Sequence, residues 1–455
     1  MLRQADPRQN NTSPRQVIQI AWPVMVSMLS YTAMSLVDTL YVGRLGTDAL
    51  AAVGLAIPVM MLLVFFGQGV LRAVKVTVAQ ATGAEDHTTA RSTAWQGVWA
   101  ATGLTLAVYL LVPLLPVLMT WMGAGLAVTD LAVAYGLIRM LGVPGRYGYQ
   151  ALSGWFQGRG DTRTPMVAMV LANVINILLD PILIFGWGPV PALGVVGAAL
   201  ATNVGEFVGT SFLVFRMLPQ VRGVSRRPDR AVLERIRVLG VPLGIQGVTD
   251  VLAFTVFAAI LARIGEAHMA AHVIVIRIIM VSFLPGHALS EAAGVLVGQA
   301  VGANRPDQAR EALRWSLVLG VGFMAIMGGV FWLVPGPFID AFGVSDDVRV
   351  IAMDLMLLAA CFQVFDAVAM IGYGALSGAG DTRFVMRASL AVSWGVKVPL
   401  VWLFAGPLAR GAQGAWTALT LEIIVLAALV WWRTQGTAWL DRCGEAQDLA
   451  IEARS

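Results

Sequence analysis

The sequence predicts an all-α polytopic membrane protein with twelve transmembrane helices in two pseudo-symmetric six-helix lobes. Three observations support this fold class. Of the 455 residues, 58% are hydrophobic and only 13% are charged, whereas a soluble domain carries about 25% charged residues. The apolar residues form continuous runs rather than an alternating pattern, which favours spanning helices over a membrane barrel. The runs also fall into two similar sets of six.

Twelve apolar segments follow one another along the chain, and each is long enough to cross a bilayer. Glycine, proline and arginine separate them and mark the expected helix ends. The first six segments lie at 17–43, 50–81, 93–121, 128–156, 164–187 and 193–217. The second six lie at 232–263, 268–300, 310–334, 347–376, 384–406 and 412–433.

Basic residues gather in the N-terminal tail and in the loops that follow even-numbered segments. The connection between the sixth and seventh segments and its flanks hold seven of them: Arg216, Arg222, Arg226, Arg227, Arg230, Arg235 and Arg237. Because Lys and Arg favour the cytoplasmic side, we expect both termini in the cytoplasm. The predicted parts are a cytoplasmic tail (1–16), an N-terminal lobe (17–217), a basic cytoplasmic linker (218–231), a C-terminal lobe (232–433) and a second cytoplasmic tail (434–455).

The two halves of the chain repeat one another. The sequence at 79–84, Ala-Gln-Ala-Thr-Gly-Ala, returns at 298–303 as Gly-Gln-Ala-Val-Gly-Ala, a shift of 219 residues. Gly-Asp-Thr-Arg at 160–163 returns at 380–383, shifted by 220. Because each half has an even number of spans, the copies have the same orientation and are related by an axis along the membrane normal.

Acidic residues inside apolar segments are the strongest candidates for function, because a carboxylate at bilayer depth costs a few kcal/mol. In the first half these are Asp38 and Asp180. Each belongs to a polar stripe on one helical face, since its members are spaced by three or four residues. The two stripes are Tyr31, Ser35 and Asp38, and Asn173, Asn176 and Asp180.

Two carboxyl groups held together in a low-dielectric interior repel one another and can load and release a proton near neutral pH. We therefore expect Asp38, Asp180 and Asn176 to form an ion- or proton-coupling site, with Tyr31, Ser35 and Asn173 lining a substrate cavity. Two alternatives stay open. Asp180, which precedes Pro181, could cap a broken helix, or the acids could pair with arginines and hold the fold.

The second half carries its own acids, Asp250 and Asp366. Gln246 lies one turn before Asp250, and a further stripe is formed by Gln363, Asp366, Met370 and Tyr373. Carboxylate and amide oxygens in this arrangement could bind a cation or a cationic substrate. The alternative, which the sequence supports equally, is an internal salt network that includes Lys397, the only lysine of the second half.

Several absences narrow the function. The two lysines are each flanked by valines, so neither belongs to a phosphate-binding loop, and no motif of a membrane protease or esterase is present. Transport would then draw on an ion gradient, and we expect neither an enzyme nor a bound cofactor. His268 and His272 are one turn apart, but without a third ligand they predict no metal site. Buried cations such as Arg139 and Arg146 receive no role, since snorkelling explains some of them.

Two motifs give the chain a family resemblance. The stretch 35–46, Ser-Leu-Val-Asp-Thr-Leu-Tyr-Val-Gly-Arg-Leu-Gly, follows Pro23 and precedes Leu-Ala-Ala-Val-Gly at 50–54. Together they resemble the first-helix signature of the MATE (multidrug and toxic compound extrusion) transporters. Gly-Asp-Thr-Arg-Thr-Pro at 160–165 and its second copy resemble that family's repeated cytoplasmic motif. The similarity extends from about residue 15 to residue 433.

The resemblance carries implications for the polar residues. Asn-Ile-Leu-Leu-Asp-Pro at 176–181 is similar to the fifth helix of the DinF-like branch, which implies an acidic centre of Asp38 and Asp180, with Asn176 beside it and Thr202 near it. Asp250 and Asp366 match positions where NorM-like members carry cation-binding acids, with Asp250 in place of their usual Glu. The chain thus combines acids that resemble both branches.

The resulting hypothesis is a secondary antiporter that exports amphipathic, cationic compounds in exchange for H⁺ or Na⁺ by alternating access between two lobes. We expect it to act as a monomer on small molecules, in contact with lipid and not with nucleic acid. One alternative is a lipid-linked precursor flippase of the same wider superfamily, which Arg72, Lys75 and Arg146 would suit. Another is a channel or a receptor that transports nothing.

Overall fold

The fold is described from a computed structural model that covers residues 12–122 and 125–440. Helices make up nearly all of these residues, and within them the only extended pairing is a single bridge between Trp187 and Val190. Most of the two predicted tails, at 1–11 and 441–455, lies outside the described residues.

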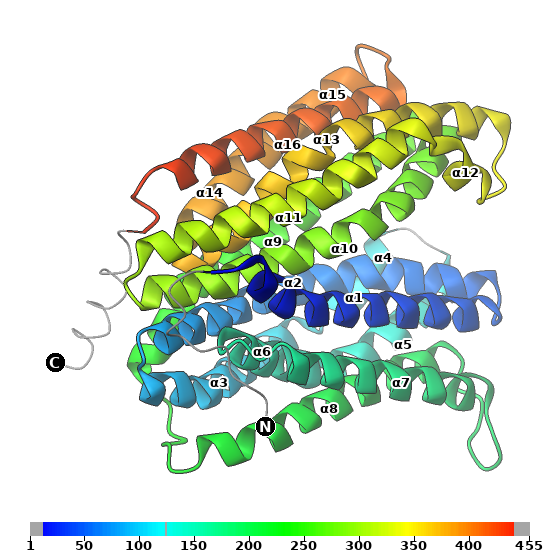
Figure 1. Cartoon of the computed structure of the whole chain (residues 1–455). Coiled ribbons are helices and arrows are strands. Elements are labelled where there is room, and N and C mark those ends of the chain that lie inside the picture. Colours follow the sequence, from blue (N-terminus) through cyan, green and yellow to red (C-terminus); the bar gives the residue numbers. More distant parts are fainter. Residues whose placement is uncertain (1–11, 123–124, 441–455) are drawn as a thin grey trace. The chain divides into compact units, whose positions relative to one another are not determined.

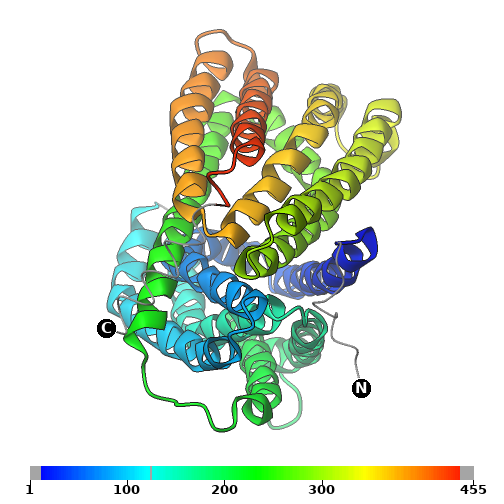
Figure 2. The ribbon, with the colours of Figure 1, turned by 60° about the vertical axis from the view of Figure 1, so that its left-hand side comes forward.

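Eight helices make up the first half (Figure 1): α1 (Pro14–Gly43), α2 (Thr47–Gly83), α3 (His87–Leu111), α4 (Leu114–Trp121), α5 (Leu126–Leu141), α6 (Val143–Gly158), α7 (Arg163–Phe185) and α8 (Val195–Met217). A short 3-10 helix, η1 (Leu218–Val221), and an irregular stretch then connect α8 to α9; Figure 2 shows this connection in green.

The second half contains eight α-helices and one π-helix: α9 (Arg230–Ile264), α10 (Glu266–Gly302), α11 (Pro306–Leu333), α12 (Pro335–Asp340), α13 (Asp346–Ala379), α14 (Thr382–Val392), the π-helix η2 (Ser393–Lys397), α15 (Val398–Ala405) and α16 (Gly411–Gln435).

The number of spans agrees with the sequence. Among the described residues, eleven helical segments are long and apolar enough to cross a membrane, and α5 with α6 makes a twelfth across a bend of 45°. The chain is therefore a multi-pass membrane protein, and the predicted all-α fold class with twelve spans is confirmed.

Three predicted segments are interrupted rather than continuous. The segment 93–121 divides into α3 and α4 at Pro113, and 128–156 divides into α5 and α6 at Gly142, two residues before Pro144. Proline has no N–H to donate and its ring crowds the preceding turn, so both breaks have a local cause. The segment 384–406 contains the π-helix η2, whose wider turn the apolar pattern does not predict.

The described chain forms two compact units. One contains residues 26–244, and the other contains residues 12–25 together with 245–440. The boundaries fall inside α1 and α9, at 26 and 245, so they are related by the shift of 219 residues that relates the two sequence repeats. The N-terminal part of α1 thus belongs to the unit of the second repeat, and the N-terminal part of α9 belongs to the unit of the first repeat. The lobe limits 17–217 and 232–433 stay predictions of where the repeats begin and end.

The repeat is visible in matching backbone details. After α2, the Asp86 N–H donates to the carbonyl of Ala81 at 2.9 Å, and after α10 the Arg305 N–H donates to that of Ala300 at 2.9 Å. These are the six-to-one bonds that close a helix end. Gly160 and Gly380, in the two Gly-Asp-Thr-Arg copies, both have a left-handed backbone, with φ of 84° and 92°. That conformation favours glycine because it has no Cβ.

Each unit has its own apolar core, which holds the polar side chains in place. The core of residues 26–244 includes Leu71, Leu115, Tyr147, Trp155 and Phe156. The core of the other unit includes Phe257, Phe331, Phe362 and Trp416. Within such cores a polar group without a partner is costly, so the contacts of the interior polar residues are informative.

Candidate functional site

The predicted coupling residues of the first half come together in one unit. Asp180 is 0% exposed on α7, and Asp38 is half-buried on α1. The two carboxyl groups interact electrostatically. The amide nitrogen of Asn176 lies 3.4 Å from Asp180 Oδ1 and 3.4 Å from the hydroxyl of Thr202. We call Asp38, Asn176 and Asp180 the N-lobe acid centre.

Three acceptor oxygens of the N-lobe acid centre are buried and unpaired. Asp38 Oδ1, Asn176 Oδ1 and Asp180 Oδ2 receive no hydrogen bond from any described residue. A buried acceptor without a donor costs about 1–3 kcal/mol, and more if it is charged. Protons and small monovalent cations are the groups that such an oxygen cluster can bind.

The alternative in which Asp180 caps a broken helix does not fit the backbone. Helix α7 continues through Pro181 to Phe185, so Asp180 lies inside the helix rather than at its end. Its neighbour on the stripe, Asn173, donates to the hydroxyl of Ser30 on α1 at 2.8 Å. The polar face of α7 therefore meets α1 at Ser30, which lies next to Tyr31 of the predicted stripe.

The remaining predicted cavity residues differ in their surroundings. Tyr31 is 48% exposed and Ser35 is also exposed. Thr202 is half-buried and donates to the carbonyl of Ala198 at 2.9 Å, so its oxygen is left to accept from Asn176. Their role in lining a substrate cavity stays a prediction.

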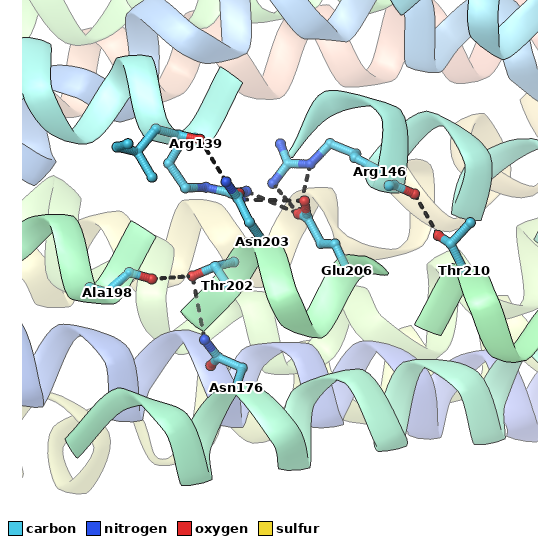
Figure 3. A network of polar contacts seen from close by, with 10 residues as sticks. Arg139, Arg146, Asn176, Ala198, Thr202, Asn203, Glu206 and Thr210 are labelled. Atoms are coloured by element: carbon cyan, nitrogen blue, oxygen red, sulfur yellow. Dashed lines mark hydrogen bonds and ion pairs between the residues drawn. The ribbon is translucent and has the colours of Figure 1, made fainter. Parts of the chain in front are cut away.

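Three residues that sequence reasoning did not assign form an ion cluster beside this centre, the arginine clamp of Arg139, Arg146 and Glu206 (Figure 3). Arg139 Nη2 lies 2.9 Å from Glu206 Oε1, and Arg146 Nη2 also lies 2.9 Å from that oxygen. Arg139 is only 5% exposed, so it does not snorkel to the membrane surface. Glu206 meets the criterion that singled out Asp38, an acid inside an apolar segment, and that criterion could have found it.

The arginine clamp spans the break between α5 and α6. Arg139 lies in the last turn of α5 and Arg146 in the first turn of α6, while Glu206 is in the middle of α8. A Cβ at Gly142, between the two helices, would collide with the side chain of Asn203. Asn203 itself accepts from Arg139 and donates to the carbonyl of Ile138 at 2.6 Å. The broken span and α8 are thus held together by polar contacts.

The predicted residues of the second half belong to the other unit. Asp250 on α9 accepts a hydrogen bond from Ser389 on α14. Gln363, which is fully buried, donates to Ser282 at 2.9 Å, while its Oε1 is unpaired among the described residues. Asp366 Oδ2 and the hydroxyl of Tyr373 are likewise buried without a described partner.

Gln246 is half-buried on α9, one turn before Asp250. Its assignment to the second site stays a prediction. The two predicted acids interact electrostatically with residues on neighbouring helices, Asp250 with Tyr373 and Asp366 with Glu422.

Lys397 pairs with an acid that sequence reasoning overlooked. Its ammonium lies 2.8 Å from Glu422 Oε1 on α16, which also accepts from Ser393 at 2.8 Å. Lys397 and Ser393 are the two ends of the π-helix η2, a type of turn that is frequent at functional sites. An internal ion pair is therefore present, as one of the two open alternatives predicted, but its acid is Glu422.

The two histidines serve as hydrogen-bond acceptors. His268 Nδ1 accepts from the backbone N–H of Ala412 at 3.3 Å, and His272 Nδ1 accepts from the indole of Trp416 at 3.2 Å. Both contacts tie α10 to α16. Across the described ranges no three His, Cys, Asp or Glu residues are grouped so as to hold a metal ion.

Comparisons with known families identify the chain. A family profile described as MatE matches residues 23–182 and 242–403, one block in each repeat. The chain belongs to the MATE family. It is therefore a transporter and not an enzyme.

Curated MATE relatives cover almost the whole chain. A protein of Pseudomonas aeruginosa named "Probable multidrug resistance protein NorM" is 32% identical over 419 residues, which is 89% of this chain and 86% of the relative. A protein of the same name from Mesorhizobium japonicum is 30% identical over 451 residues, 96% of each chain. Both carry the NorM name, so the DinF-like assignment stays a prediction from the motif at 176–181.

Solved MATE structures share the fold. A structure described as MATE in the bent conformation has a TM-score of 0.86 at 22% identity and covers 99% of this chain and 98% of that one. A MOP superfamily transporter from Pyrococcus furiosus, whose description suggests a different function from the reversed polarity of its pocket, has a TM-score of 0.84 at 22% identity, with 97% of each chain covered. The fold alone thus leaves the substrate open.

Proposed function

We propose that the chain is an antiporter that exports amphipathic, cationic small molecules across the bacterial inner membrane in exchange for H⁺ or Na⁺. The multidrug resistance names of its relatives support the substrate class. The observation that carries the coupling is the N-lobe acid centre, in which three buried acceptor oxygens of Asp38, Asn176 and Asp180 have no described partner. The proposed transporter acts as a monomer with both termini in the cytoplasm.

The proposed cycle couples charge at the acid centre to the conformation of α1. Binding of a proton or Na⁺ removes negative charge beside Asp38, which weakens the binding of a cationic substrate and changes the hydrogen bonds that this side chain accepts. Residues 14–25 of α1 belong to one compact unit and residues 26–43 to the other. A change at Asp38 therefore acts on a helix that both units share, and it shifts the balance between inward-open and outward-open states.

The test is efflux of a fluorescent cationic dye from proteoliposomes, with a pH gradient and a Na⁺ gradient imposed separately. Dye efflux by the wild-type protein should respond to one of these two gradients. Asp38→Asn and Asp180→Asn should each lose most of that response, because an amide cannot bind a proton and binds Na⁺ poorly. Asp130→Asn, at an exposed carboxylate on α5 in the same unit, is the matched control and should keep it.

Full dye efflux by Asp38→Asn under an imposed gradient would refute the coupling site. Counterflow of a preloaded labelled dye separates a carrier from a channel or a receptor, since neither of these exchanges solute across a closed membrane. The same assay with a lipid-linked substrate addresses the flippase alternative. That alternative loses support from the structure, because Arg146, one of the cations that favoured it, is bound by Glu206.

A further inference from the structure

The arginine clamp lies close enough to the acid centre to influence it. Arg139 donates to Asn203 on α8, and the adjacent Thr202 accepts from Asn176 of the acid centre, so one turn of α8 contacts both groups. The charge of Arg139 also interacts electrostatically with Asp38. Both residues belong to the same compact unit, and Asp38 has a buried oxygen without a described partner. Arg139 therefore has two acidic residues within its electrostatic reach, Glu206 and Asp38, and in this structure it binds Glu206.

Both carboxylate oxygens of Glu206 bind the guanidinium of Arg139. The guanidinium makes two contacts to the carboxylate, Nη2 to Oε1 at 2.9 Å and Nη1 to Oε2 at 3.3 Å. It also donates to the amide oxygen of Asn203, whose nitrogen is fixed on the carbonyl of Ile138. Paired hydrogen bonds of this kind fix the direction of a guanidinium as well as its position. Figure 3 shows the side chains of Arg139 and Arg146 converging on Glu206.

The charges in this part of the unit nearly balance. The titratable side chains that interact electrostatically with one another around Arg139 and Asp38 are Tyr31, Asp38, Tyr135, Arg139, Arg146, Tyr147, Asp180 and Glu206. With the tyrosines neutral, three carboxylates face two guanidinium groups, which leaves one negative charge. One bound monovalent cation brings the group to neutrality. Without the charge of Glu206, the two arginines alone would balance Asp38 and Asp180.

We propose that Glu206 is a positioning residue that keeps Arg139 away from the N-lobe acid centre and thereby preserves the affinity of that centre for the coupling cation. This proposal rests on the proposed function of Asp38 and Asp180. When Arg139 is released, its positive charge stabilises the free carboxylates and competes with the cation. The coupling site then needs a lower pH, or more Na⁺, to fill.

A purely structural role is the competing explanation, because the clamp also ties the broken α5–α6 span to α8. Another contact between the same elements offers a matched control without charge. Thr210 on α8 donates to the carbonyl of Gly145 on α6 at 2.6 Å. Thr210→Val removes this tie and leaves every charge in place.

The experiment measures dye efflux from proteoliposomes as a function of pH, or of Na⁺ if that ion drives transport. Glu206→Gln should lower the pH of half-maximal transport by about one unit or more, or raise the half-saturating Na⁺ concentration about tenfold or more. Arg139→Gln/Glu206→Gln should return the midpoint to near the wild-type value, because the competing charge is gone. Thr210→Val should leave the midpoint unchanged even where it lowers stability.

A wild-type midpoint in Glu206→Gln, or a midpoint in the double variant equal to that of Glu206→Gln, would overturn the proposal. If Glu206→Gln does not fold, the single variant Arg139→Gln tests the proposal. Glu206 can still bind Arg146 in this variant, but the positive charge of Arg139 is lost. The midpoint of transport should therefore move to higher pH or to a lower Na⁺ concentration. An unchanged midpoint in Arg139→Gln would also overturn the proposal. Asp38→Asn distinguishes failure of the positioning role from failure of the proposed function. If Asp38→Asn loses coupling but Glu206→Gln shows no shift of the midpoint, the proposed function stands and the positioning role of Glu206 is refuted.

Discussion

The buried ion pair between Lys397 and Glu422 allows a quantitative prediction about stability. The two side chains are 7% and 5% exposed, and their charged atoms are 2.8 Å apart. At an effective dielectric constant of about 20, unit charges at that distance attract one another by about 6 kcal/mol. Desolvation of both groups offsets most of this, so the pair as a whole adds little, whereas removal of one partner leaves a buried charge and costs about 3–5 kcal/mol.

The perturbations are therefore Lys397→Met, Glu422→Gln and the double variant. Each single variant should lose about 3–5 kcal/mol of unfolding free energy. The double variant should lie close to wild type, because no charge is left unpaired. The assay is unfolding in detergent micelles, followed by the fluorescence of the 14 tryptophans. Equal stability of all three variants, or a double variant that is as unstable as the single ones, would refute the assignment of a buried ion pair.

Two further predictions contrast a buried and an exposed ion pair. Asp381, in the second Gly-Asp-Thr-Arg copy, is 0% exposed and binds Arg433 Nε at 2.7 Å, so Arg433→Met should lower the unfolding free energy by about 3 kcal/mol in the same assay. Asp340 is exposed, and its hydrogen bond to Arg349 holds its pKa below the usual range. A lowered pKa contributes stability at neutral pH that is lost as the pH falls through that pKa. Asp340→Asn should therefore make the unfolding free energy slightly less dependent on pH in the acid range and leave its value at neutral pH unchanged, since exposed pairs contribute little. A large loss of stability at neutral pH would contradict this.

Much of the site could be predicted because each helix presents its residues with a known period. The spacing of Asn173, Asn176 and Asp180 placed them on one face of α7, and the structure brings that face against α1. Acids in apolar segments also stood out from composition alone. The same rule applied to every segment also selects Glu206 and Glu422.

What the sequence could not provide is the choice of partners between helices. Arg139 and Glu206 are 67 residues apart, and Lys397 and Glu422 are 25 apart, so no local pattern connects them. Both acids of the N-lobe acid centre were equally plausible partners for a buried arginine. The structure shows that Glu206 binds it, which leaves the oxygens of the centre unpaired.

The sequence by itself determined the membrane location, the number of spans and the twofold repeat, because these depend on the length and order of apolar runs and on local turn chemistry. Only the tertiary structure decided where a span contains a π-helix, before Val398, and which buried charges neutralise one another. The physical reason is that burial is a property of a segment, whereas an ion pair depends on distances of a few ångströms between side chains that packing alone brings together.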